Sequence, residues 1–263
     1  MQLIVFASGS SGNCLLLSSG DSHILIDAGI SMRRISAGLT RAGISWHDIG
    51  GVLITHEHSD HISGLKTLIR QRSLPIYAPR TVSNRLRGML PGIDACLHII
   101  PVGEAFGVSG FRVSAFHTPH DTDESVGYRV ERGGVFALAT DMGHVSEEVV
   151  RGLSGADTVL IEANHDPDML RFGNYPAYLK MRILSARGHL SNPDCGELAR
   201  MLCESGTRRI VLGHLSRENN RPELALQTVR AALSAYSPEL YCAPADGFLS
   251  LPVGKDVLCL RSD

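Results

Sequence analysis

Short apolar runs recur along the whole chain, separated by turns or by stretches with helical spacing. Runs of this kind, bounded by glycine, proline or polar residues, are typical of buried or half-buried strands. The predicted strands cover residues 3–6, 14–17, 23–26, 52–54, 76–78, 97–100, 111–116, 126–130, 135–139, 158–161, 209–212, 240–242 and 248–251. Gly133 and Gly134 indicate a hairpin between two of them.

Other segments repeat their apolar residues three and four positions apart, which predicts helices. The predicted helices cover residues 31–42, 60–70, 81–89, 176–186, 192–204 and 222–235. Gly43 is a suitable C′ residue for the first helix, and Asn192 with Pro193 reads as N-cap and first residue of the fifth.

Both halves of the chain combine strands with helices, and no linker, repeat or low-complexity segment separates them. We therefore expect residues 1–263 to form a single α/β (α+β) domain. Two mixed β-sheets packed face to face and flanked by helices, an αββα sandwich, would fit this order of elements. An ordinary doubly wound sheet would fit it as well, so the motifs must decide.

Composition narrows the class of protein only slightly. A hydrophobic content of 43% with 20% charged residues is ordinary for a soluble enzyme, and a net charge of −2 gives no global attraction to nucleic acid. Two stretches nevertheless lack acidic residues, one between Asp60 and Asp94 and the other over residues 169–193. Their cations are Lys66, Arg70, Arg72, Arg80, Arg85 and Arg87, and Arg171, Lys180, Arg182 and Arg187. They either face an anionic substrate or are solvated helix faces.

The cysteines and the start of the sequence bear on the compartment. None of the six cysteines forms a CxxC pair, which argues against a structural zinc ribbon and a disulfide scaffold. The first residues have no basic segment typical of a signal peptide, and no apolar stretch reaches the roughly 18 residues that span a bilayer. We expect a cytoplasmic protein without a membrane segment.

The strongest chemical signal is the sequence Thr-His-Glu-His-Ser-Asp-His at residues 55–61, directly after an apolar strand. In an extended loop, His56 and His58 can point toward one cation. Asp60 and His61 can then face a second cation as the loop turns into a helix. Imidazole and carboxylate donors suit zinc, manganese or iron, and the absence of a thiolate keeps manganese open.

This HxHxDH motif resembles the signature of the metallo-β-lactamase superfamily, whose fold is the αββα sandwich. Asp27, in LIDAG, is similar to the superfamily's aspartate that orients the histidine loop. Asp141, in ATDMG, resembles its metal-bridging carboxylate, and His214, in LGHLS, its last metal ligand. For the third motif His117 and His120 compete, and we favour His120 because Asp121 follows it as in the family pattern.

The resemblance implies two divalent ions, Zn2+ or Mn2+. His56, His58 and His120 would hold one ion; Asp60, His61, His214 and the shared Asp141 would hold the other. The order of histidines also resembles RNase Z-type enzymes, which implies that His189 is the proton donor and His214 the ligand. Glu162 either supports His189 or is an ordinary carboxylate at a strand end. A metal-bridging hydroxide would then attack the substrate.

Within the superfamily the chain is most similar to the YycJ/WalJ-type group, through SGSSGN at residues 8–13, EANHD at 162–166, GHLSN at 188–192 and HLSRENN at 214–220. That group is regarded as nucleases, some with 5′-to-3′ exonuclease action on DNA. The likeness adds Ser11, Asn13, His165 and Asn219 as residues around the metals or the substrate. Residues 8–13 are either an anion-binding nest or a plain tight turn.

The resemblance thus implies a phosphodiesterase or nuclease acting on DNA or RNA. A hydrolase of a cyclic phosphodiester or a thioester is the alternative, because this fold serves many substrates. A binding or sensor module without turnover is a third hypothesis. It predicts a broken ligand set, whereas this set is intact.

Overall fold

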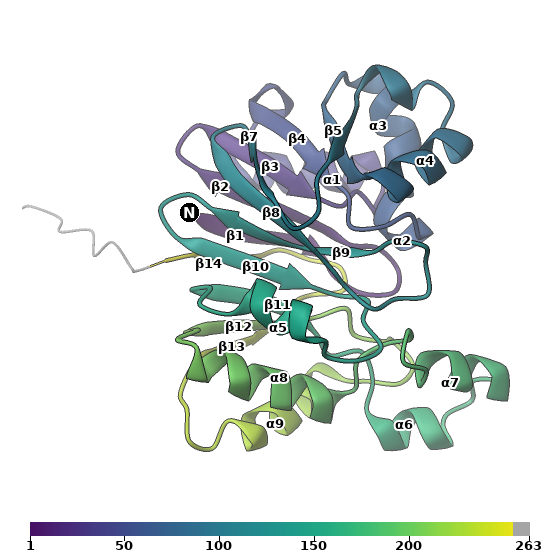
Figure 1. Cartoon of the computed structure of the whole chain (residues 1–263), viewed down its shortest axis with the longest axis vertical. Coiled ribbons are helices and arrows are strands. Elements are labelled where there is room, and N and C mark those ends of the chain that lie inside the picture. The colour runs from purple at the N-terminus through teal and green to yellow at the C-terminus, as the bar shows by residue number, and fades with distance from the viewer. Residues whose placement is uncertain (255–263) are drawn as a thin grey trace, which may run out of the picture.

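The computed structural model describes residues 1–254 and contains two seven-stranded β-sheets packed face to face, with helices on their outer sides (Figure 1). The strand order is β14-β1-β2-β3-β4-β5-β6 in one sheet and β13-β12-β11-β10-β9-β8-β7 in the other. This arrangement confirms the predicted αββα fold class and excludes the single doubly wound sheet.

The strands of each sheet follow one another closely in the sequence. The first sheet consists of β1 (Gln2–Ala7), β2 (Cys14–Ser19), β3 (Ser22–Ile26), β4 (Ile49–Leu53), β5 (Ile76–Pro79), β6 (Leu97–Ile100) and β14 (Leu249–Pro252). The second consists of β7 (Ala105–Val108), β8 (Phe111–His117), β9 (Val126–Glu131), β10 (Val135–Ala139), β11 (Thr158–Glu162), β12 (Arg209–Gly213) and β13 (Glu239–Cys242).

The helices lie mainly between these strands in the sequence. They are α1 (Met32–Ala42), α2 (Ser59–Ile62), α3 (Leu65–Gln71), α4 (Arg80–Met89), α5 (Glu147–Leu153), α6 (Pro167–Phe172), α7 (Ala177–Ile183), α8 (Asn192–Glu204) and α9 (Pro222–Ala232), with 3-10 turns at Trp46–Asp48 and Ile93–Ala95. No helix within residues 1–254 combines the length and the hydropathy needed to cross a bilayer.

Three apolar layers hold the sandwich together, and the alternation of side chains along each strand creates them. In β1, Leu3 and Val5 belong to the layer between the two sheets, whereas Ile4 and Phe6 pack on the opposite side beneath the helices. The outer layer of the first sheet is shared with α1, α3 and α4, and that of the second sheet with α5, α8 and α9.

Each sheet is antiparallel on one side and parallel on the other. Strands β3 to β6 pair in parallel, and so do β10 to β13. The carboxyl ends of parallel strands lie at one edge of a sheet, where loops offer their side chains to ligands. The polar residues predicted from the sequence lie at this edge, in the loops after β3, β4, β10, β11 and β12.

Several predicted elements need correction. The helix predicted over residues 60–70 is divided into α2 and α3, because the N–H of Gly64 donates to the carbonyl oxygen of Ala28 and the carbonyl oxygen of Asp60 accepts from the N–H of Asn13, so that these two groups do not bond within a helix. Ser191, and not Asn192, caps α8 by accepting a hydrogen bond from the backbone N–H of Asp194, so Asn192 is the first helical residue. The helix predicted over residues 176–186 is shorter at both ends.

Three short elements were missing from the predicted set: β7, α5 and α6. The two helices have clear start signals, with Ser146 and Asp166 as N-caps and Pro167 in the first turn of α6. Their lengths of seven and six residues leave too few turns for a periodic pattern. The five described cysteines are free thiols, and Cys259 lies outside the described residues.

Candidate metal centre

The histidine loop begins where β4 leaves the sheet and ends in the first turn of α2. His56 and His61 are completely buried, whereas His58, at the N-cap position of α2, is partly open to solvent. The loop runs extended up to His58 and becomes helical at Ser59, and the centre of the His61 ring lies 4.1 Å from that of the His56 ring, so the donors of the helix lie beside those of the loop. Two groups of donors result.

The first group consists of His56, His58 and His120, each of which offers a nitrogen within 4.8 Å of the others. His58 Nδ1 lies 3.2 Å from His120 Nε2. His56 Nε2 is buried without a hydrogen-bond partner, although a buried polar atom normally has one. A cation bound between the three rings would supply the missing interaction.

The second group consists of Asp60, His61, Asp141 and His214, again with donor atoms within 4.8 Å of one another. His214 Nε2 lies 3.3 Å from Asp60 Oδ2 and 3.4 Å from Asp141 Oδ1. Asp141 Oδ1 is also 3.7 Å from His120 Nε2, so this carboxylate lies between the two groups. Its Oδ2 is buried without a hydrogen bond. The donor set therefore fits two adjacent divalent cations.

Burial lowers the pKa of the histidine rings in this site, and neighbouring carboxylates raise it. Burial, and then the neighbouring His61, hold the pKa of His56 well below its usual value; burial likewise lowers the pKa of His120. Burial would also lower the pKa of His61 and of His214, but the carboxylates outweigh it. Asp27 and Asp141 raise the pKa of His61 well above its usual value, and Asp141 with Asp60 raises that of His214 to about 10. The second group thus stabilises positive charge.

Backbone strain coincides with this site. Asp27, Asp141 and His214 have φ angles of 60°, 58° and 55°, in the left-handed region that residues other than glycine rarely occupy. Each of them follows the end of a parallel strand, β3, β10 or β12. Strain of this kind costs on the order of 1–3 kcal/mol per residue and persists where the surrounding structure enforces it, often at functional sites.

Asp27, which the resemblance predicts to orient the histidine loop, contacts both ends of that loop. Its Oδ2 lies 2.8 Å from His61 Nδ1, and its Oδ1 accepts a hydrogen bond of 2.9 Å from the backbone N–H of Thr55. The Nδ1 contact leaves Nε2 of His61 to face Asp60 and Asp141. Asn13 reaches the same ring, with its Nδ2 3.1 Å from His61 Nε2.

Glu162 closes the opposite side of the site and is completely buried. Its Oε1 lies 2.8 Å from His189 Nδ1 and 3.0 Å from His214 Nδ1, while Oε2 accepts hydrogen bonds from two backbone N–H groups. Burial would raise the pKa of Glu162, but His189 and His214 outweigh it and lower the pKa to about 2. Glu162 therefore contacts both rings, which favours a supporting role for it over an ordinary strand-end carboxylate.

His189 and His214 differ in their access to solvent. The His189 side chain is 22% exposed, whereas that of His214 is 2% exposed. His189 belongs to a third group of donors with Asp141, Glu162 and His214. Because Glu162 occupies Nδ1 of His189, Nε2 is the ring nitrogen left for a substrate.

The two candidates for the third motif lie in different surroundings. His117 is at the end of β8 with a side chain 53% exposed, and its backbone N–H donates a 2.8 Å hydrogen bond to Glu148 Oε1. His120 is buried, with its Nδ1 3.3 Å from the carbonyl oxygen of Gly188. Arg187, one of the basic residues singled out in the sequence, donates to the carbonyl oxygens of His120 and Thr122 and so supports this loop.

The outer residues predicted from the sequence divide into two sets. Asn13, His165 and Asn219 are buried, with His165 Nδ1 and Asn219 Oδ1 lacking hydrogen bonds. Ser11 is exposed and does not line the pocket, which has Ser10 in its wall instead.

The anion-nest alternative for residues 8–13 depends on free backbone N–H groups. The N–H of Gly9 donates to Asn13 Oδ1 and that of Gly12 to the carbonyl oxygen of Gly9. Both amides are used inside the turn, which favours a plain tight turn.

A cavity of about 210 Å³ opens over both donor groups. Its polar wall includes His58, Asp60, Asp141, His189 and His214. The segment around α7 supplies another part of the wall, which consists of Tyr175, Leu179, Arg182 and Ile183. Sequence reasoning did not assign these four to the site, although the acid-free stretch over residues 169–193 contains all of them.

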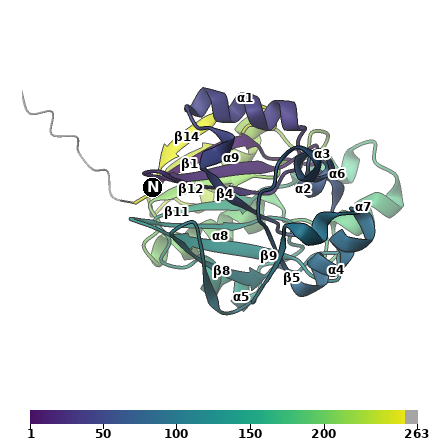
Figure 2. The same ribbon diagram turned by 90° about the horizontal axis from the view of Figure 1, so that it is seen from above.

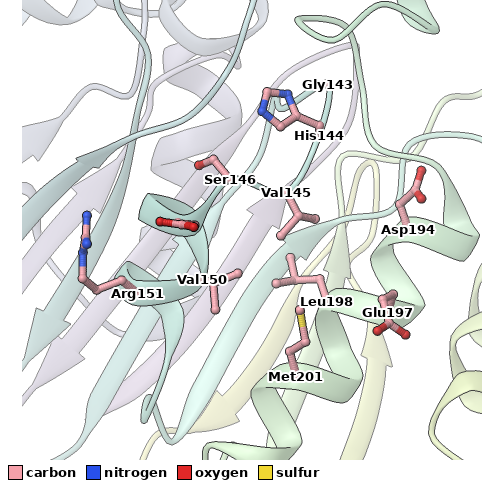
Figure 3. A pocket seen from close by; sticks show the side chains of 11 residues that line it. Gly143, His144, Val145, Ser146, Val150, Arg151, Asp194, Glu197, Leu198 and Met201 are labelled. Carbon is pink, nitrogen blue, oxygen red and sulfur yellow. The ribbon is translucent and has the colours of Figure 1, made fainter.

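A larger cavity of about 560 Å³ lies between α5 and α8 (Figure 3). Val145, Val150, Leu198 and Met201 line it, with charged side chains such as Arg151 at its rim. It contains no converging group of metal donors, so the smaller cavity is the candidate active site.

Comparisons with known proteins agree with this geometry. Residues 22–215 match the family described as Beta-lactamase superfamily domain. Exodeoxyribonuclease YycJ of Bacillus anthracis is 37% identical over 87% of this chain and 88% of its own length. Exodeoxyribonuclease WalJ of Streptococcus pneumoniae serotype 2 is 38% identical over 86% of this chain and 85% of its own. The crystal structure of Zn(2+)-bound PqqB from Methylobacterium extorquens superposes with a TM-score of 0.72 at 20% identity, covering 96% of this chain and all of that one.

Proposed function

Because the chain belongs to the beta-lactamase superfamily, we propose that it is a metal-dependent hydrolase that cleaves phosphodiester bonds in DNA, as a 5′-to-3′ exonuclease. The observation that carries this proposal is the pairing of two adjacent donor groups with the His189–Glu162 pair in one open cavity. The two exodeoxyribonucleases, which align over more than four fifths of both chains, support DNA as the substrate.

We assign the first metal position to His56, His58 and His120, and the second to Asp60, His61 and His214, with Asp141 between them. The metals we propose are Zn2+ or Mn2+, which accept these nitrogen and carboxylate donors. When bound, two such ions lower the pKa of a water molecule and screen the charge of a phosphate.

The side chains around the metals supply the remaining functions. Asp27 fixes the ring of His61 through Nδ1, which sets the direction of Nε2. His189 is the proposed general acid: it would donate its Nε2 proton to the departing oxygen when the phosphodiester bond breaks. Glu162 favours the protonated ring, because its carboxylate raises the pKa of His189 although burial alone would lower it.

The free thiols among the described cysteines support the cytoplasm as the compartment, where reduced cysteines persist.

The test is a substrate panel with protein loaded with Zn2+ or Mn2+. We expect end-labelled DNA to be shortened from its 5′ end, and a bis-aryl phosphate to be cleaved more slowly. Chelation with EDTA should stop both reactions. RNA strands and a thioester complete the panel. Cleavage of the thioester alone would reject the nuclease and favour a small-molecule hydrolase.

A further inference from the structure

The segment of residues 167–184, which contains α6 and α7 and is called the α6–α7 segment below, exposes unusual apolar surface. Phe172, Tyr178, Met181 and Leu184 are 77%, 75%, 72% and 59% exposed. They are the most exposed large apolar side chains in the described part of the chain. The segment projects beyond the sandwich on the same side as α2, in both views (Figures 1 and 2).

The inner side of the same segment forms one wall of the candidate active site. Tyr175, Leu179 and Ile183 line the cavity above the metal donors. In α7, Tyr178 and Met181 are three residues apart on the solvent side, whereas Leu179 and Ile183 are four apart on the cavity side. Tyr178 and Met181 lie on the side of α7 that faces away from the cavity, so a chain-like substrate that leaves the cavity would pass over α7 to reach them.

Apart from Asp168 in the first turn of α6, the charges of the segment suit a polyanion. No acidic residue occurs over residues 169–193. The Arg171 guanidinium lies 5.6 Å from the centre of the Phe172 ring, and Arg182 lines the cavity while pairing with Asp121. Lys180 donates hydrogen bonds of 2.8 and 2.7 Å to the carbonyl oxygens of Arg171 and Gly173, which ties α7 to the end of α6.

Exposed aromatic rings beside cations are the chemistry that binds single-stranded nucleic acid, since bases stack on rings and phosphates pair with guanidinium groups. We propose that the α6–α7 segment is a stacking platform that grips the bases of single-stranded DNA, through Phe172 and Tyr178, next to the nucleotide in the cavity. The proposal rests on the proposed function. A second copy of this chain is a poorer occupant, because a two-fold interface would bring the cations of one copy close to those of the other.

The test compares two proteins. One has the native α6–α7 segment, and the other is the Phe172→Ala/Tyr178→Ala double variant. Asp60→Ala is added to both so that the DNA stays intact during the binding measurement. The probes are a fluorescent strand of about 12 thymidine nucleotides and the same strand with abasic sugars, which keeps the phosphates but has no bases. Met89→Ala removes an exposed apolar side chain from α4 and is the matched control.

We expect the Kd for the thymidine strand, measured by fluorescence anisotropy, to rise about tenfold for each ring removed. Both proteins should bind the abasic strand equally, and the Met89→Ala control should bind both strands like the native segment. Without the Asp60→Ala change, the double variant should keep its native kcat on the bis-aryl phosphate and its native melting temperature.

Other outcomes overturn the stacking platform. Equal binding of the thymidine strand by both proteins would remove it and leave the nuclease intact. An equal loss of affinity for thymidine and abasic strands would show that the segment acts without the bases. A native dimer that the double variant converts to a monomer would make a second copy the occupant. Failure of the native protein to bind or cleave DNA, with the bis-aryl phosphate still cleaved, would reject DNA as substrate and the platform with it.

Discussion

Two histidines, His189 and His214, share the carboxylate of Glu162 and differ in what lies on their other side. Both rings line the cavity, but His214 Nε2 faces the carboxylates of Asp60 and Asp141, whereas the His189 side chain is the more exposed of the two. The sequence makes the two hard to separate, because each stands in a Gly-His-Leu-Ser motif. The surroundings of the two rings support the proposed roles, since a metal ligand needs neighbouring donors and a general acid needs access to the substrate.

Replacement of each ring by alanine should therefore have different effects. His214→Ala should lower the metal content from about two ions per chain toward one, because the second group loses a donor. His189→Ala should keep both ions and lower kcat for DNA by about 10² to 10⁴, the usual contribution of a general acid. Metal content is measured by elemental analysis after dialysis, and kcat at saturating DNA.

His117→Ala is the control for both variants. The exposed His117 side chain contacts Glu148 outside the metal cavity, so its loss should change neither metal content nor kcat. Loss of metal in His117→Ala or His189→Ala, with full metal in His214→Ala, would show that the ligand roles are assigned to the wrong rings.

At the scale of elements, two loops meet α2 beside the metal donors. The N–H of Asn13 donates a 2.8 Å hydrogen bond to the carbonyl oxygen of Asp60, and the N–H of Gly29 donates one of 2.8 Å to the carbonyl oxygen of Asn13. Gly29 lies so close to α2 that a Cβ would be 1.6 Å from the carbonyl oxygen of Asp60. Only glycine lets the loop after β3 support the residue that carries Asp60.

Gly29→Ala should therefore displace Asp60 and weaken metal binding. We expect metal affinity to fall by about 10- to 100-fold, the usual cost of disturbing the groups behind a ligand, and the free energy of unfolding to fall by about 1–3 kcal/mol. Affinity is measured by competition with a chromophoric chelator, and stability by urea unfolding of the metal-free protein.

Gly88→Ala in α4 is the matched control, because its Cβ would meet no atom within 4 Å. Alanine favours a helix interior over glycine by roughly 1 kcal/mol, so this variant should be slightly more stable with native metal affinity. Native metal affinity in Gly29→Ala would show that the loop can shift without moving Asp60.

The resemblance to the superfamily predicted the donors, and these donors follow one rule: polar residues after an apolar strand meet at the carboxyl ends of the sheets. Asp27, Asp141 and His214 are of this kind. This rule could not predict the cavity residues of the α6–α7 segment. Tyr175 and Ile183 line the cavity only because of where the whole segment lies. The likeness to the YycJ/WalJ-type group placed Ser11 near the site, whereas Ser10 lines the cavity, because which serine of the turn faces the cavity depends on the turn's backbone.

At the scale of the whole molecule, the metal donors join the two halves of the sandwich. His56, His58, Asp60 and His61 follow β4 of the first sheet, whereas His120, Asp141 and His214 follow strands of the second. The first and second donor groups each contain residues from both sheets. A bound ion therefore acts as a cross-link between layers that are otherwise held by apolar packing.

Metal should consequently raise the stability of the fold as a whole. A ligand that binds only the folded state adds about 2.7 kcal/mol at a free concentration 100 times its Kd. For a domain of this size that corresponds to a rise in melting temperature of about 5–10 °C, seen by calorimetry when Zn2+ or Mn2+ is added to chelated protein. The chelated protein should still melt cooperatively, because three buried apolar layers remain. Ca2+ should have little effect, since it prefers oxygen ligands, and His214→Ala should reduce the rise. If the chelated protein were already unfolded, or if Zn2+ and Mn2+ left the melting temperature unchanged, the donors could not be a cross-link between preformed sheets.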